Sequence, residues 1–257
     1  MGAVAAFGLA IGVLLGLLGA GGSILAVPAL VYGADQPLSA AVPTSLLVVG
    51  VSAAAAVVPR LRNKEVQWRL AAAFSLPGVP AAFAGTAVNR LLGPRPVLAG
   101  FALLMVVAAV RMLREQPESG GDCALPGGGV NWRSCLPKAL ASGSIVGFLT
   151  GLFGVGGGFL IVPALVLLLG LPMAVAVGTS LVVVAVNSAA GFVSHAGDAE
   201  LDYRLAAAFT LAAVVGSLLS SRVASRLPAD TVRRWFAYLV LAVAAFVLVQ
   251  AVSRPIS

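Results

Sequence analysis

A long stretch with almost no charge is the feature that most constrains how this chain folds. Between Pro137 and Asp198 the single formally charged side chain is Lys138. A helix needs about 20 consecutive apolar residues to span a bilayer, so this stretch is long enough for more than one span. Over the whole chain 60% of the residues are hydrophobic and 10% are charged, too few polar residues to cover a soluble fold. The sequence therefore predicts an all-α integral membrane protein.

The chain is also duplicated. The segment 16–30, GLLGAGGSILAVPAL, precedes the segment 151–165, GLFGVGGGFLIVPAL, by 135 residues (151 − 16). The same shift aligns further segments downstream, and chance does not produce a match of this length. We expect three parts, namely membrane repeat 1 over 1–115, a cytoplasmic linker over 116–136 and membrane repeat 2 over 137–257.

Each repeat contains about four apolar regions. They run roughly over 2–33, 38–59, 69–90 and 96–113 in repeat 1, and over 137–170, 173–194, 204–224 and 233–252 in repeat 2. The opening region of each repeat is too long for one simple span and carries clustered glycines, which weaken a helix. We expect a helix, a break at the glycines and a second helical piece, which either crosses the bilayer or re-enters.

The charges of two equivalent loops predict how the repeats are oriented. The loop after the second region carries Arg60, Arg62, Lys64 and Arg69 in repeat 1, whereas its counterpart carries Asp198, Glu200 and Asp202 in repeat 2. Lys and Arg accumulate on the cytoplasmic side of membrane proteins. Equivalent loops on opposite sides indicate an inverted-topology repeat, a common design of secondary transporters.

Several residues suit helix packing or interfacial positions better than chemistry. Glycines recur every fourth residue at Gly8, Gly12, Gly16, Gly143, Gly147 and Gly151, a spacing that lets a neighbouring helix approach closely. The two cysteines, Cys123 and Cys135, fit no zinc pattern and are expected to be incidental thiols. The sequence shows no metal-ligand cluster, no catalytic pair at membrane depth and no basic patch for nucleic acid. We therefore expect no enzyme, no cofactor and no nucleic-acid partner.

The glycine breaks are the best candidates for a binding site. A broken helix near the bilayer midplane presents free N–H groups and a positive dipole end, which suit an anion, although the glycines could also only allow a bend. Thr44-Ser45 and Thr179-Ser180 open the second region of each repeat, and their hydroxyls could donate to an anion or bond their own helix. Asn187 lies deeper in the second region of repeat 2, and its side-chain amide could donate to a pore or to a neighbouring helix. We expect no charged residue within the core of a span, so neutral donors would hold the anion.

The duplicated glycine-rich openings, each followed by a Thr-Ser pair, resemble the TauE/SafE family of sulfite and organosulfur anion transporters. The resemblance implies substrate contacts at residues spread over both repeats. These are Gly19, Gly21, Gly22, Pro28, Thr44 and Ser45, with Gly154, Gly156, Gly157, Gly158, Pro163, Thr179 and Ser180. We add two residues to this predicted substrate site, namely Ser23, which stands where repeat 2 has Gly158, and Asn187.

The function expected from this resemblance is export of a small sulfur oxyanion, sulfite first, by alternating access between the two repeats. The partners are then a small inorganic or organosulfur anion and the lipid bilayer. The resemblance also implies a multi-pass protein of the plasma (inner) membrane. Uptake of another small anion, such as a sulfonate, sulfate or thiosulfate, is one alternative. A membrane scaffold that transports nothing is another.

Overall fold

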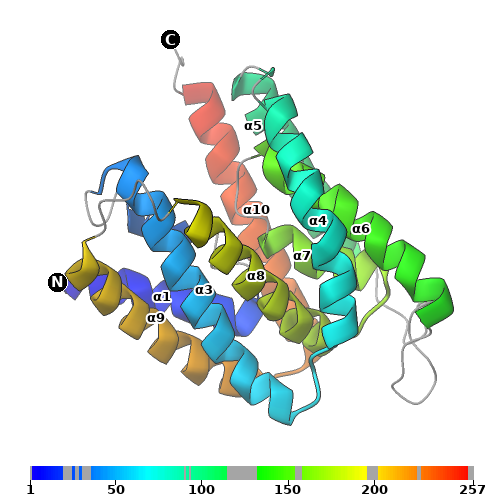
Figure 1. Ribbon diagram of the computed structural model, residues 1–257, viewed down its shortest axis with the longest axis horizontal. Helices are drawn as coiled ribbons and strands as arrows, with labels where there is room; N and C mark the ends of the chain where they lie inside the picture. Colours follow the sequence, from blue (N-terminus) through cyan, green and yellow to red (C-terminus); the bar gives the residue numbers. More distant parts are fainter. Residues whose placement is uncertain are drawn as a thin grey trace. The chain divides into compact units, whose positions relative to one another are not determined.

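The computed structural model describes residues 2–19, 25–26, 29–30, 36–89, 91–92, 94–114, 132–153, 158–195, 202–224 and 227–253, and these residues are almost entirely helical. The helices (Figure 1) are α1 (Gly2–Leu18), α3 (Leu38–Arg62), α4 (Trp68–Asn89), α5 (Pro94–Arg114), α6 (Trp132–Phe153), α7 (Gly158–Pro163), the π-helical η1 (Ala164–Leu168), α8 (Met173–His195), α9 (Tyr203–Ala224) and α10 (Ala229–Ser253).

Five of these helices are long and apolar enough to cross a membrane: α3, α4, α6, α8 and α9. Of these, α3, α4, α8 and α9 lie where the sequence predicts an apolar region, within three residues at each end, and α6 covers the first part of the region predicted over 137–170. The larger difference is α6, which begins at Trp132, inside the expected linker. The prediction of a helical multi-pass membrane protein is therefore confirmed.

Both opening regions contain the expected interruption. In repeat 1, α1 ends at Leu18, directly before the first glycines of the cluster. In repeat 2, α6 ends at Phe153 and α7 begins at Gly158. The pieces α7 and η1 together cover 158–168, which rises only about 16 Å, roughly half of a bilayer core.

The helices group into two compact units, each containing helices of both predicted repeats. Unit 1 comprises Met1–Ala72 and Ala174–Leu227, and unit 2 comprises Ala73–Met173 and Pro228–Ser257. Unit 1 thus holds α1, α3, α8 and α9, and unit 2 holds α5, α6, α7, η1, α10 and most of α4. The packing units differ from the two sequence repeats, which stay a prediction about the chain's duplication.

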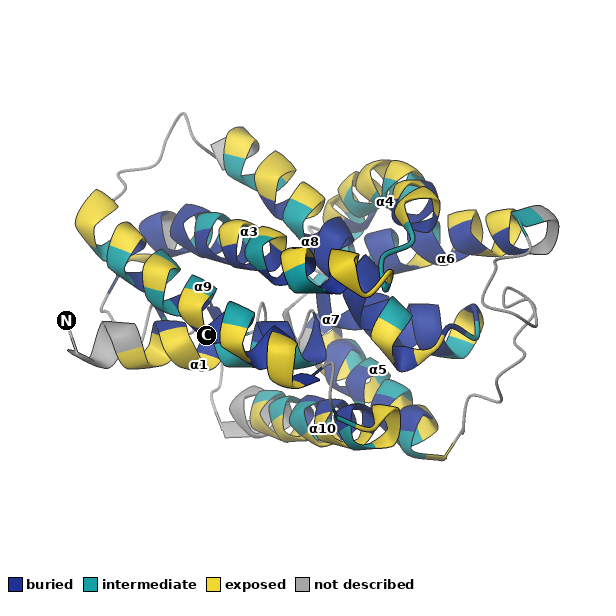
Figure 2. Cartoon of the chain, turned by 90° about the horizontal axis from the view of Figure 1, so that it is seen from below, coloured by how far each residue is buried: buried dark blue, intermediate teal, exposed yellow. Residues whose placement is uncertain are grey.

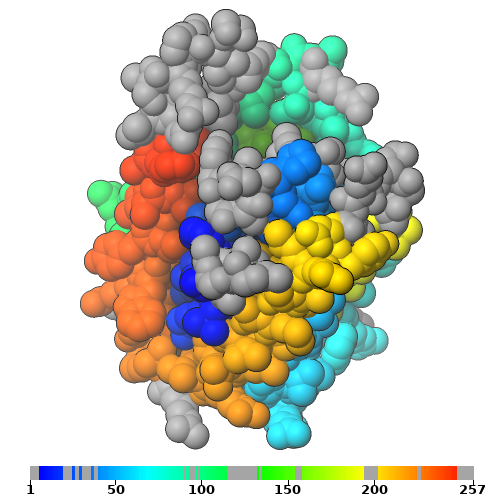
Figure 3. All heavy atoms as spheres, turned by 90° about the vertical axis from the view of Figure 1, so that its left-hand side faces the viewer, coloured from blue at the N-terminus to red at the C-terminus, as the bar shows by residue number. Residues whose placement is uncertain are grey.

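In unit 1 the glycines of α1 lie directly against the backbone of α9. A Cβ added to any of them would press on a carbonyl oxygen of α9, in the pairs Gly8 with Phe209, Gly12 with Ala213 and Gly16 with Ser217. Figure 3 shows α1 (dark blue) beside α9 (orange) on one face of the molecule. The expected role of these glycines in close helix packing is confirmed.

Unit 2 repeats this contact with the equivalent residues of the other repeat. The pairs are Gly143 with Phe74, Gly147 with Gly78 and Gly151 with Ala82, and adding or subtracting 135 converts each into a pair of unit 1. The opening helix of each repeat therefore packs on the third region of the other repeat. Small residues on both helix surfaces allow this packing between helices of different repeats, because they let the two backbones come into contact.

The burial pattern shows which helix faces pack inside. On α9 the buried residues recur every three or four positions, from Ala206 through Phe209, Ala213 and Ser217 to Ser221, a spacing that places them on one side of the helix. Figure 2 shows the exposed residues of α9 in yellow along its length. On the opposite side of α9, at least half of each side chain is exposed for Leu211, Val215 and Leu219. Apolar side chains facing outward are expected where lipid is the solvent.

One sequence expectation is wrong. Cys135, at the start of α6, is disulfide-bonded rather than an incidental thiol. The other cysteine of the sequence, Cys123, lies outside the described residues. Two thiols are a weak signal in a sequence, because spacing along the chain does not show whether their Cβ atoms can approach.

Candidate functional site

The glycine break of repeat 1 begins with a helix cap. Gly19 has φ 84°, in the left-handed region that residues with a Cβ rarely adopt, and its N–H donates to the carbonyl of Leu15 over 2.9 Å. This is the bond that ends a helix on a left-handed glycine. The first glycine of the cluster therefore terminates α1.

The last carbonyls of α1 receive donors from other helices. The carbonyl oxygen of Gly16 accepts from the Ser221 hydroxyl of α9 at 3.4 Å and from the Arg60 guanidinium of α3 at 3.1 Å. Carbonyls in the last turn of a helix have no partner within that helix, and water is scarce at membrane depth. Side chains from neighbouring helices thus make the interruption of α1 stable.

The equivalent end of α6 is held in a corresponding way within unit 2. The Thr86 hydroxyl lies 3.5 Å from the carbonyl oxygen of Gly151, and the Asn89 amide donates to that of Leu152 over 2.5 Å. Thr86 and Ser221 are themselves equivalent (86 + 135 = 221), as are Gly151 and Gly16. Both repeats therefore support the broken helix with a hydroxyl from the other repeat.

An aromatic cluster in unit 2 spans the break of repeat 2. The ring of Phe101 on α5 lies 5.3 Å from that of Phe153, the last residue of α6, and 5.4 Å edge-to-face from that of Phe159 on α7. Such pairs stabilise beyond the area they bury. Phe101 thus contacts the helical pieces on both sides of the glycines.

The two Thr-Ser pairs lie in unit 1 and are buried. Ser45 and Ser180 donate to carbonyls of their own helices, at Val42 over 2.7 Å and Val177 over 2.8 Å. These serines thus adopt the helix-bonding alternative. Thr179 accepts from the N–H of Gln67 at 3.2 Å, whereas the Thr44 hydroxyl has no hydrogen-bond partner among the described residues.

The packing of α3 against α8 separates the two pairs. Gly50 lies beside Ser188, and Gly191 beside Leu46, so the two helices run antiparallel. Thr179 lies instead at the other end of α3, where Glu65 and Gln67, just after that helix, pack on α8. Because Leu46 pairs with Gly191, the level of Thr179 corresponds to position 58 of α3 (46 + 191 − 179). This level is fourteen residues beyond Thr44 (58 − 44), a distance of about 20 Å along the helix. Thr44 and Thr179 therefore do not form one cluster.

The structure describes only some of the remaining predicted site residues. Gly158 and Pro163 are buried in α7, and Asn187 is exposed on α8. Seven further positions lie outside the described residues, namely Gly21, Gly22, Ser23, Pro28, Gly154, Gly156 and Gly157. The assignment of these residues to a substrate site stays a prediction.

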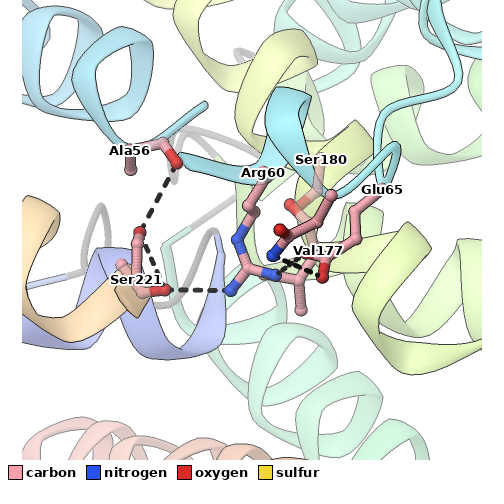
Figure 4. Close-up of polar contacts among 8 residues, drawn as sticks. Ala56, Arg60, Glu65, Val177, Ser180 and Ser221 are labelled. Carbon is pink, nitrogen blue, oxygen red and sulfur yellow. Dashed lines mark hydrogen bonds and ion pairs between the residues drawn. The ribbon is translucent and has the colours of Figure 1, made fainter. Parts of the chain in front are cut away.

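The structure corrects the position expected for Arg60. We expect it in the loop after the second apolar region, but it lies in the last turn of α3 and is only 2% exposed. Its guanidinium forms an ion pair with Glu65 at 2.9 Å (Figure 4). A Pro-Arg sequence at the end of an apolar run resembles a loop, and only the packing of α1, α3 and α9 encloses the side chain.

Comparison with known proteins identifies the family. The profile of the family described as "Sulfite exporter TauE/SafE" matches residues 4–247. The chain belongs to the TauE/SafE family. This TauE/SafE protein is 34% identical over 245 residues to a "Probable membrane transporter protein" of Xylella fastidiosa (strain 9a5c), covering 93% of this chain and 91% of the relative.

More distant relatives carry similar names. The chain is 26% identical over 242 residues to the "Probable membrane transporter protein YunE" of Bacillus subtilis (strain 168), covering 88% and 89% of the two chains. It is 26% identical over 194 residues to the "Probable membrane transporter protein MJ0441" of Methanocaldococcus jannaschii, covering 73% and 69%. No solved structure matches the chain significantly. The family and these relatives support a membrane transporter.

Proposed function

We propose that this TauE/SafE protein exports a small sulfur oxyanion, sulfite first, across the plasma membrane by alternating access. The observation that carries the proposal is the pair of equivalent helix ends at Leu18 and Phe153. Irregular backbone at membrane depth is tolerated where it is buried in protein or lines a cavity, and transporters bind substrates at such broken helices.

The residues proposed to contact the anion are those predicted from the sequence. Side chains already donate to carbonyl oxygens at the C-terminal ends of α1 and α6. These paired oxygens therefore do not repel an anion as free carbonyls would. In this proposal the donors to the anion are backbone N–H groups that follow the breaks, together with the hydroxyl of either Thr44 or Thr179, which lie at different levels of unit 1. An inside-negative potential favours exit of an anion by about 2.3 kcal/mol per charge per 100 mV.

The moving parts in this proposal are the compact units. The opening helix of each repeat packs on a helix of the other repeat, because α1 lies on α9 and α6 lies on α4 in backbone contact. A rigid-body movement of one repeat against the other would break both contacts. Movement of unit 1 and unit 2 as bodies preserves them.

A counterflow assay in liposomes tests the proposal. Purified protein is reconstituted, and labelled sulfite, sulfate, thiosulfate and sulfoacetate are offered in turn, with empty liposomes as the control. We expect exchange of sulfite above the control. No exchange of any of the four anions by protein shown to be folded would refute the function.

Two glycine variants separate transport from a scaffold role. Gly21→Leu and Gly156→Leu place a bulky side chain in the breaks, and we expect both proteins to insert in the membrane without exchanging sulfite. A scaffold predicts that these variants behave as the unmodified protein does.

A further inference from the structure

Helix α3 carries buried polar atoms that lack a partner in unit 1. They are Thr44 Oγ1, Ser52 Oγ and Arg60 Nε, each with no hydrogen-bond partner among the described residues. The three residues are spaced by eight, and Gln36, two residues before the helix, carries a fourth such atom in Oε1. Buried polar atoms are almost always paired, so a set of them on one helix marks a place for a ligand or an ordered water.

These residues belong to one row of side chains along α3. Every fourth residue from Thr44 to Arg60 is buried, with exposures of 0% for Thr44, Val48, Ser52 and Ala56 and 2% for Arg60. Such a row forms a continuous ridge that slants across the helix surface. Its sixteen-residue length rises about 24 Å, most of the thickness of a bilayer core.

Arg60 uses only part of its donor capacity. One terminal nitrogen pairs with Glu65 at 2.9 Å and the other donates to the Gly16 carbonyl at 3.1 Å, while Nε has no partner. Figure 4 shows the guanidinium between Ser221 of α9 and the Glu65 carboxylate. The side chain therefore retains a donor for an oxyanion without giving up its bond to α1.

A tight turn brings Glu65 to Arg60. Lys64 adopts φ 58°, and the Glu65 N–H donates to the Arg60 carbonyl over 3.1 Å. The Glu65 backbone oxygen packs against Gly178 of α8, where a Cβ would come within 2.5 Å. The carboxylate is thus positioned by its own backbone, and it is 14% exposed compared with 3% for the Arg60 side chain.

We propose that Arg60 is the charged anion-binding residue of unit 1, with Glu65 as its resident counter-ion and Ser52 and Thr44 as further donors in the same row of α3. The inference rests on the proposed transport of a small oxyanion. Guanidinium and hydroxyl groups donate to oxyanion oxygens, and an arriving anion displaces the Glu65 carboxylate. The exchange keeps the buried guanidinium compensated at every stage, because an unpaired charge at this depth is strongly unfavourable.

A purely structural Arg60 would behave differently. Its bond to Gly16 makes it a helix cap for α1, and removing Glu65 would then only destabilise the protein. If Glu65 competes with the anion, removing its charge strengthens anion binding. Glu65→Gln therefore discriminates between the two roles.

The experiment measures sulfite binding to the purified full-length protein through the sulfite-dependent rise in Tm, at constant ionic strength adjusted with sodium chloride. We expect Arg60→Gln to weaken binding about tenfold or more, and Ser52→Ala about two- to tenfold, from the usual strengths of charged and neutral hydrogen bonds. We expect Glu65→Gln to tighten sulfite binding severalfold. The matched control is Arg62→Gln, which removes the same charge from an exposed position of the same helix end and leaves binding unchanged.

The outcomes separate this inference from the proposed function. Sulfite exchange by the unmodified protein, combined with unchanged or weaker binding by Glu65→Gln, overturns the inference alone. Unchanged binding by Arg60→Gln does the same. If Arg60→Gln does not fold, Glu65→Gln and Ser52→Ala decide. If the unmodified protein neither binds nor exchanges any of the four anions, the proposed function fails first.

Discussion

The side-chain amide of Asn89 lies 2.5 Å from the carbonyl oxygen of Leu152 and donates to it. Asn89 ends α4 and Leu152 lies one residue before the end of α6, so the bond joins a helix of repeat 1 to the broken helix of repeat 2. We expect Asn89→Leu to lower the free energy of unfolding by about 1–3 kcal/mol, because it leaves this carbonyl unpaired. The measurement is reversible unfolding in detergent and SDS mixtures.

The control for this change is Asn187→Leu. Asn187 is exposed on α8, and we expect its replacement to alter stability by no more than about 0.5 kcal/mol. Equal losses in the two variants would show that the Asn89 bond does not support the helix end.

The glycine row of α1 predicts a sharp difference between two small substitutions. A Cβ at Gly12 would press on the carbonyl of Ala213, whereas a Cβ at Gly100 meets nothing closer than the Phe153 ring at 3.5 Å. We expect Gly12→Ala to destabilise by about 1–3 kcal/mol through overpacking. Gly100→Ala is expected to be neutral or to stabilise by up to about 1 kcal/mol. Thermal unfolding in detergent distinguishes them, and a tolerated Gly12→Ala would contradict the packing.

A cross-link between α3 and α8 tests which parts move during transport. A Cβ at Gly50 would lie 3.2 Å from the Ser188 Cβ, close to the 3.5–4.5 Å typical of disulfides. We expect Gly50→Cys with Ser188→Cys, in a chain with both native cysteines replaced by serine, to form a disulfide and still exchange sulfite. Both positions belong to unit 1. Loss of exchange on oxidation, restored by reductant, would show that the sequence repeats move instead.

The disulfide of Cys135 provides a test of orientation. The basic residues Arg111 and Arg114 end α5 and favour a cytoplasmic linker, whereas disulfides persist mainly outside reducing compartments. We expect the linker inside, where cytosolic reductants keep this disulfide open as thiols in growing cells, and the bond closes only in an oxidising medium. A membrane-impermeant maleimide should then label the thiols only after permeabilisation. Labelling in intact cells, or labelling that requires added reductant even after permeabilisation, would show that the linker lies outside.

The broad architecture could be predicted from the sequence because the bilayer imposes simple rules. Apolar runs of span length become helices, and the predicted regions match the bounds of α3, α4, α8 and α9 closely. The glycine cluster also predicted where the opening helices stop. Gly19 shows the reason, since a residue without a Cβ adopts the left-handed conformation that ends α1.

The donors that hold the broken helices were harder to predict. Thr86 and Ser221 are both hydroxyl residues related by the 135-residue shift, and this pairing was a usable signal. Asn89 has no such signal, because its equivalent is Ala224. The role of a residue that differs from its equivalent in the other repeat can be recognised only when the neighbouring helix is known.

The sequence alone determined the membrane environment, the duplication and the breaks, because these depend on hydrophobicity and local backbone freedom. The tertiary structure decided which helices exchange between the repeats, where the Thr-Ser pairs lie and how Arg60 is enclosed. The reason is that one charge on a helix end is an interfacial anchor or a buried ligand according to what packs around it. For Arg60, the backbone of α1 and the carboxylate of Glu65 supply that surrounding, and neither is visible in the order of the residues.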